Sequence, residues 1–158
     1  MYALNTAGGL FANLEETKKK NVDDPEANLF SILYDLESMR NKDGDFHFKL
    51  CYPELTQFEF PCNEWKQSSN PVNESTITGF DGITLTFPKS DAGSFQGLGL
   101  SPPSFSTTLI DCYPNSGYWC YSIGSLRYWG SDTVPGPFNA SCTRVKMVEL
   151  SVLYTERG

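Results

Sequence analysis

The spacing of hydrophobic residues differs between the first quarter of the chain and the rest. In the first part, Leu29, Leu33 and Leu36 recur at the spacing that places side chains on one face of an α-helix. Asp24 is a favourable N-cap residue, and Pro25 suits the first position of a helix because its missing N–H is not needed there. The pattern therefore predicts an amphipathic helix that begins at Asp24.

In the remainder of the chain the period changes to two. Phe46, Phe48 and Leu50 alternate with polar residues, and similar alternation recurs at 83–87 and 148–154. Successive side chains of a strand point to opposite faces of a sheet, so each run is expected to bury one face and expose the other. These runs predict antiparallel strands.

The two patterns divide the chain into two expected parts. Residues 1–42 are predicted to form a helical N-terminal segment, and residues 43–158 a strand-rich domain. The 13 glycines, 10 prolines and 14% aromatic residues favour short strands joined by tight turns. The predicted fold class is therefore mainly β: an antiparallel β-sandwich of jelly-roll type with an N-terminal amphipathic helix.

The predicted leucine stripe needs an apolar partner. It can pack against its own domain, or against copies of itself in a short coiled coil, because so few heptads do not distinguish the two. In the second case the chain forms a homo-oligomer, and a trimer is the expected state. The residues expected at that seam are Leu29, Phe30, Leu33 and Leu36.

Residues 29–54 carry a resemblance to a known family. The stretch LFSILYDLESMRNKDG resembles the start of the C-terminal propeptide of fibrillar collagens, and Cys51-Tyr52-Pro53-Glu54 is similar to that family's cysteine-histidine-proline step. The resemblance implies a short helical stalk where three chains meet, but it brings no counterpart of the family's calcium loop. The strand-rich part looks like an invertebrate extracellular sandwich module. The matching positions in the first stretch are Leu29, Ser31, Ile32, Leu36, Glu37, Met39, Arg40, Asp43 and Gly44.

Five cysteines bear on covalent structure. No CxxC pair is present and the chain has one histidine, so a thiolate metal site is not expected. Local pairing of Cys51 with Cys62 and of Cys112 with Cys120 is the favoured arrangement, and other pairings stay open. Cys142 is then left over, either as a buried thiol or as an interchain bridge.

Charge and sequons indicate the compartment and exclude several partners. A net charge of −7 repels phosphate backbones and anionic lipids, so neither nucleic acid nor membrane is an expected partner. Asn73-Glu-Ser and Asn139-Ala-Ser are N-glycosylation sequons in polar, turn-rich stretches. Together with cysteines that lack a metal pattern, they predict a secreted, extracellular protein.

Clustered aromatic residues raise a carbohydrate-binding alternative. Aromatic rings stack on the C–H faces of sugars, while carboxylates and amides bind sugar hydroxyls. On a strand, however, Trp119 shares a face with Ile123, which is more typical of a core. The candidate glycan-binding residues are Tyr118, Trp119, Tyr128 and Trp129.

The sequence contains none of the common catalytic motifs that we considered. There is no G-x-S-x-G elbow, phosphate loop or H-E-x-x-H, and His47 has no recognisable nucleophile beside it. Asn41, Asp43 and Asp45 do not follow the ligand order of a calcium loop, so no metal or cofactor is expected. The sequence therefore predicts a non-enzymatic module that assembles chains in an extracellular matrix or fibre, or alternatively a lectin-like module that binds glycan or a matrix protein.

Overall fold

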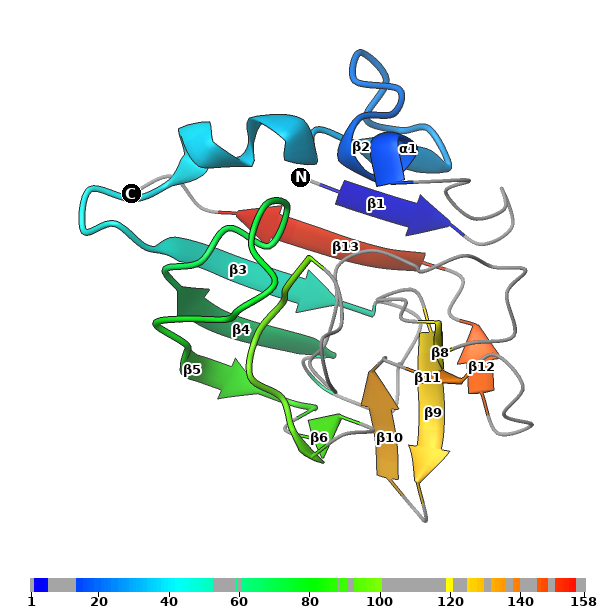
Figure 1. Ribbon diagram of the computed structural model, residues 1–158. Helices are drawn as coiled ribbons and strands as arrows, with labels where there is room; N and C mark the ends of the chain where they lie inside the picture. Colours follow the sequence, from blue (N-terminus) through cyan, green and yellow to red (C-terminus); the bar gives the residue numbers. More distant parts are fainter. Residues whose placement is uncertain are drawn as a thin grey trace.

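The computed structural model is mostly strands (Figure 1). Its largest element is a six-stranded antiparallel sheet with the order β2-β1-β13-β3-β4-β5. Its strands, in that order, are Leu29–Ser31, Tyr2–Asn5, Leu150–Thr155, Phe46–Cys51, Cys62–Gln67 and Asp81–Leu85. The structure describes residues 2–5, 14–52, 59, 61–87, 89–90, 93–100, 119–120, 125–129, 132–135, 138–139, 145–147 and 150–155.

Smaller elements accompany this sheet. A three-stranded antiparallel sheet has the order β10-β9-β12, and β9 and β10 run across the direction of the large sheet in Figure 1. Its strands are Asp132–Pro135, Ser125–Trp129 and Val145–Met147. Two-stranded pairs join β11 (Phe138–Asn139) to β8 (Trp119–Cys120) and β6 (Lys89–Ser90) to β7 (Gly93–Ser94). The helices are α1 (Leu14–Lys18) and the 3₁₀-helix η2 (Leu33–Met39).

The alternation in β3 confirms the predicted strand. Phe46, Phe48 and Leu50 are buried, and His47 and Lys49 between them are half-buried. The neighbouring strand β4 follows the same period, and its residues opposite the buried phenylalanines and leucine are buried too. These are Gln67, Trp65 and Asn63.

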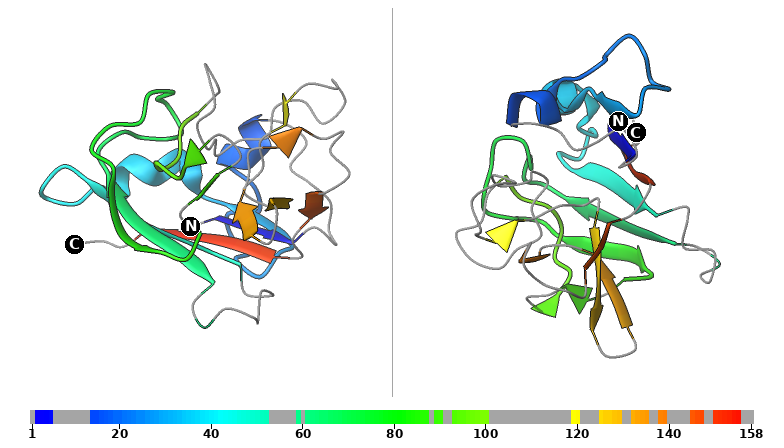
Figure 2. Two further views of the ribbon diagram at one scale, coloured as in Figure 1. Left: turned by 90° about the horizontal axis from the view of Figure 1, so that it is seen from below. Right: turned by 90° about the vertical axis from the view of Figure 1, so that its right-hand side faces the viewer.

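The core lies on one face of the large sheet. There Trp65 stacks on Phe48, with ring centroids 5.3 Å apart, and meets Phe95 edge-on at 4.9 Å. The covering residues come from η2 and from the segments after β4 and β5, which lie on the same side of the sheet (Figure 2, left). They are Leu33, Leu36, Val72, Phe87, Phe95 and Leu98.

The predicted helix from Asp24 is not formed, and that prediction is wrong. The residues that follow the expected N-cap form only a turn, in which the Ala27 N–H donates to the Asp24 carbonyl at 3.1 Å. The chain then enters the strand β2, which pairs with β1, and turns through the 3₁₀-helix η2. A 3₁₀-helix repeats every three residues, so Leu33 and Leu36 still share a face, one turn apart.

The leucine seam is also contradicted by the structure. Leu33 and Leu36 are each 1% exposed and belong to the core cluster of their own chain, while Leu29 packs against it. Phe30, which was expected on the flank of the seam, is 4% exposed. The apolar partner of these residues is therefore their own domain, and they are not available to a sister chain.

The expected division at residue 42 does not coincide with a structural boundary. Strands β1 and β2 of the N-terminal part belong to the same sheet as β3, β4 and β5. The C-terminal strand β13 joins the two groups, since it pairs with β1 on one side and β3 on the other. Residues 1–42 and 43–158 thus contribute to one sheet.

The β-rich character of the fold is confirmed. In the part of the chain that the structure describes, the core face of the sheet is covered by η2 and by loop segments. A second sheet packed face to face with the first, as in a sandwich, is not shown among the described residues.

Leu33→Ala tests this packing. Removing a fully buried leucine side chain is expected to lower the free energy of unfolding by about 2–5 kcal/mol, because it loses apolar burial and leaves a cavity. Urea denaturation followed by circular dichroism measures the change. Tyr34→Ala on the same helix, where the side chain is 54% exposed, is expected to change stability by less than about 0.5 kcal/mol. If Leu33→Ala left stability unchanged and altered the native mass instead, the burial assignment would be wrong.

Candidate functional site

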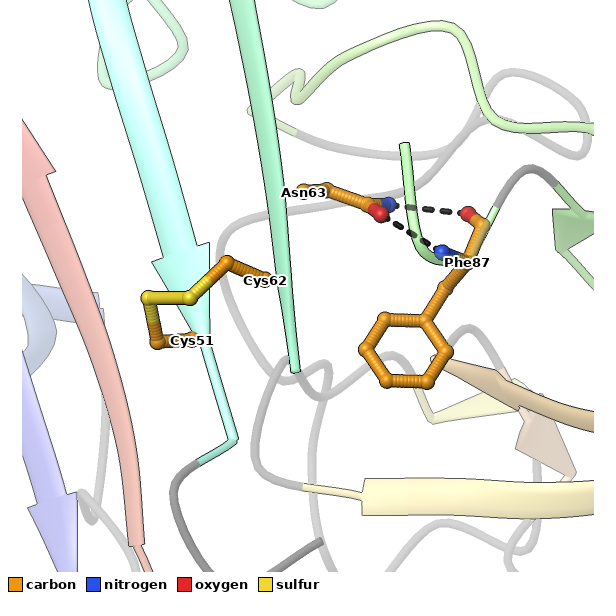
Figure 3. Close-up of a disulfide and its surroundings, with 4 residues drawn as sticks. All are labelled: Cys51, Cys62, Asn63 and Phe87. Carbon is orange, nitrogen blue, oxygen red and sulfur yellow. Dashed lines mark hydrogen bonds between the residues drawn. A yellow bond between two sulfur atoms is a disulfide. The ribbon is translucent and has the colours of Figure 1, made fainter. Parts of the chain in front are cut away.

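Two carboxamide side chains on the buried face of β4 hold the covering segments in place. The first is Asn63, which forms two hydrogen bonds with the main chain of Phe87 (Figure 3). Its Nδ2 donates to the Phe87 carbonyl at 2.9 Å, and its Oδ1 accepts from the Phe87 N–H at 2.8 Å. The side chain thus satisfies both main-chain groups of a buried residue, as a neighbouring strand would.

The second carboxamide is Gln67, four residues along the same strand. Its Oε1 accepts from the Leu98 N–H at 3.0 Å and from the Trp65 indole N–H at 2.9 Å. Its Nε2 donates to the carbonyls of Leu98 at 2.9 Å and Ser69 at 2.8 Å. One buried side chain therefore satisfies polar groups from β4 and from two covering segments.

A glycine makes room for this glutamine. Gly97 has φ +93°, a conformation that side-chain-bearing residues rarely adopt, and a Cβ there would stand 2.6 Å from Gln67 Oε1. The close approach of the main chain to Gln67 consequently requires glycine at this position.

Arg40 connects three segments at the end of η2. Its guanidinium forms a bidentate ion pair with Glu37, with distances of 2.5 and 3.0 Å. The Nη1 group donates to the carbonyls of Gly44 at 2.7 Å and Ser68 at 2.6 Å, and the cation lies 4.1 Å from the centroid of the Phe46 ring. Arg40 thereby fastens η2 to β3 and to the end of β4.

The acidic partner of Arg40 is held in its charged form. Hydrogen bonds to Glu37 from Arg40, and secondly from Asn70 at 2.8 Å, lower the pKa of the Glu37 carboxyl below its ordinary value. The hydrogen bond with Glu37 in turn raises the pKa of Arg40. These groups form a hydrogen-bonded network that joins η2 to the segments before β3 and after β4.

The predicted bridge between Cys51 and Cys62 is confirmed. The two residues are Cα partners in β3 and β4, and the disulfide closes the connection between these strands (Figure 3). Cys112 and Cys142 lie outside the described residues. Cys120 is placed in β8, opposite Phe138, and its predicted bond to Cys112 stays a prediction.

The face of β3 and β4 opposite the core carries charged residues at half-buried positions. His47 Nε2 lies 3.0 Å from Glu64 Oε1, and the His47 side chain is 18% exposed. Lys49 is the Cα partner of Glu64, and Lys66 that of His47. In the described ranges no group of three or more metal-ligating side chains occurs, and no helix there is long and apolar enough for a membrane span.

Three of the four candidate glycan-binding residues, Trp119, Tyr128 and Trp129, lie on the small strands. In the β9–β10 hairpin, Trp129 is the Cα partner of Asp132, and Tyr128 that of Thr133. In the β8–β11 pair, Trp119 is the partner of Asn139. The backbone register therefore pairs each of these aromatic residues with a residue able to hydrogen-bond. Tyr118 lies outside the described residues.

The two sequons fall in different settings. Asn73 lies in the turn between β4 and β5 and is exposed. Asn139 lies in β11 and is paired with β8. Whether either carries a glycan stays a prediction.

Sequence reasoning missed the residues that organise the covering segments. Asn63 and Gln67 occupy the inward positions of an alternating run in which Trp65 is the hydrophobic member. A polar residue at an inward position of a strand needs a buried hydrogen-bond partner, so the alternation could have predicted that Asn63 and Gln67 are hydrogen-bonded in the core. It could not have predicted that their partners are Phe87 and Leu98.

Comparison with known proteins gives no relative: the chain matches no family model, no curated protein and no solved structure. The resemblance of residues 29–54 to the fibrillar-collagen propeptide accordingly stays a prediction.

Gln67→Met tests the carboxamide that spans the core. Methionine fits a similar volume but leaves the Trp65 N–H and both main-chain groups of Leu98 without their partner. The expected loss in the free energy of unfolding is about 3 kcal/mol or more, because each buried group left unsatisfied costs about 1–3 kcal/mol. Urea denaturation measures it, and Gln96→Met, at an exposed position two residues before Leu98, serves as the matched control. Equal stabilities of the two variants would contradict the assigned role.

Glu37→Gln tests the network at Arg40 through its pH dependence. The pKa of Glu37 is lower in the folded state than in the unfolded state. The stabilisation that the ionised Glu37 gives the fold is therefore complete above the unfolded-state pKa of about 4.3, and it is lost as the pH falls through the folded-state pKa. Wild type is therefore expected to be more stable than Glu37→Gln at neutral pH, and the difference should shrink below about pH 4. Unfolding curves across this range measure it. A difference that persisted unchanged in acid would rule out the ionised pair as its cause.

Proposed function

We propose that the chain is an extracellular, non-catalytic module that binds carbohydrate. The observation that carries this proposal is the register of the β9–β10 hairpin, in which Trp129 is opposed to Asp132, while the next pair, Tyr128 and Thr133, belongs to the other face of the hairpin. Sugar recognition needs a flat apolar surface beside groups that bind hydroxyls, and this pairing supplies both residue types in neighbouring strands.

The Cys51–Cys62 disulfide supports the extracellular part of the proposal. Disulfides form and persist in oxidising compartments and are rare in reducing ones. The bridge lies at the end of the β3–β4 ladder, where it restricts the connection between these strands and stiffens the sheet that supports the rest of the domain.

The proposal includes a finer fold assignment. We take the domain to be an antiparallel sandwich of jelly-roll type, in which the small sheet β10-β9-β12 forms part of a second layer. The contact between β10 and β6 supports this arrangement, because it links the small sheet to the segment that follows β5.

Self-association into a matrix or fibre, with a trimer as the expected state, is the second candidate. The buried leucines do not support it, but the outer strand β5 does, since Asp81, Gly82, Ile83 and Thr84 are all exposed and an outer strand offers main-chain groups to another chain. A register shift in the pairing of β4 with β5 works against simple extension of the sheet. The native mass of the full chain, with and without reductant, distinguishes a monomeric module from an assembling one and shows whether Cys142 links chains.

Trp129→Ala tests the carbohydrate proposal. Loss of the aromatic residue is expected to weaken glycan binding by about two- to tenfold, since one aromatic contact contributes about 0.5–1.5 kcal/mol. A glycan array followed by calorimetry on the tightest ligand measures the effect. Tyr34→Ala removes an exposed aromatic residue on η2 and is expected to bind as wild type. Asp132→Asn keeps the size of the residue opposite Trp129 and removes its charge, so it tests the same site with less risk of a folding defect. Wild-type binding by both hairpin variants would overturn the proposed site.

A further inference from the structure

Two asparagines, three residues apart in the connection between β4 and β5, serve different purposes. Asn70 is 3% exposed, and its side-chain carbonyl accepts from the Val72 N–H at 3.0 Å. Its amide donates to Glu37, and its main-chain carbonyl accepts from the N–H groups of Asn73 and Glu74 at 3.0 and 2.8 Å. Asn70 therefore builds the turn.

Asn73 contributes to this turn only through its main chain. Its side chain is exposed, and the described part of the chain holds no hydrogen bond to its carboxamide. The residues on either side are fixed: Val72 is buried, and the Glu74 carboxylate accepts from the Asn70 N–H at 2.7 Å. The Glu74 carbonyl also accepts from the Leu100 N–H at 2.9 Å. An anchored turn thus presents one asparagine side chain outward.

That outward side chain is the acceptor position of the sequence Asn73-Glu74-Ser75, an N-glycosylation sequon. We infer that Asn73 carries an N-linked oligosaccharide, an inference that rests on the proposed extracellular setting. The Asn73 amide nitrogen attacks C1 of the first sugar of a lipid-linked oligosaccharide pyrophosphate. The N–C1 bond forms, the bond between C1 and the pyrophosphate oxygen breaks, the amide gives up one proton, and the lipid pyrophosphate leaves.

The geometry permits this modification without cost to the fold. Attachment to Asn73 displaces no hydrogen bond of the turn, because Asn70 supplies them, and the glycan projects from a position that the core does not use. The same modification on Asn70 would bury a sugar against Glu37 and Val72. Of these two asparagines only Asn73 has both the sequon and the exposure.

The experiment expresses the full chain behind a supplied secretion signal in eukaryotic cells. Wild type is expected to lose mass on treatment with peptide N-glycosidase F, which leaves aspartate at position 73 in the peptide map. Asn73→Gln and Ser75→Ala are expected to lack that glycan, whereas Ser75→Thr, which preserves the sequon, keeps it. Asn139→Gln in parallel assigns any second glycan.

Secreted wild type with unmodified asparagine at position 73 would overturn the inference, as would Asn73→Gln that loses as much mass as wild type on treatment with the glycosidase. Because the secretion signal is supplied, the result does not depend on where the chain normally resides. Failure of the proposed function is seen separately, in the glycan-binding measurement with Trp129→Ala.

Discussion

The hydrogen bonds that Asn63 and Gln67 make to main-chain groups determine how the core of this domain is closed. The large sheet presents an aromatic face, and the residues that cover it come from η2 and from the segments after β4 and β5. The main chain of Phe87 and Leu98 lies outside the large sheet, so its buried N–H and carbonyl groups need other partners. The two carboxamides supply them from β4 itself, so that Phe87 and Leu98 bring their side chains into the core with their main chains satisfied.

The strands were more accessible to prediction from the sequence than the helix. In β3 the period of two agrees with the burial, since each phenylalanine faces the core and each intervening residue does not. The spacing of Leu29, Leu33 and Leu36 fitted an α-helix equally well as a strand followed by a 3₁₀ turn. The strand forms because β2 pairs with β1. Local helix propensity does not contain information about a partner so far away in the chain.

Distance along the chain between interacting residues also limits how much of the polar networks can be predicted from the sequence. Cys51 and Cys62 are close in the chain, so their bridge was the favoured pairing among several that the sequence left open. Arg40 reaches Ser68, and Gln67 reaches Leu98, across about thirty residues that no local pattern connects. The aromatic residues of β9 were visible as candidates, whereas their pairing with Asp132 and Thr133 emerged only from the register of the hairpin.

The position of β13 has a consequence for how the chain is made. This strand, which follows all the others in the sequence, lies between β1 and β3, and so joins the pair β1–β2 to the β3–β5 meander. During synthesis the meander can assemble from neighbouring segments, but β1 and β2 have no place in the sheet until residues 150–155 have left the ribosome. The edges of β1 and β3 that pair with β13 therefore stay open until that strand is available, and open strand edges favour aggregation.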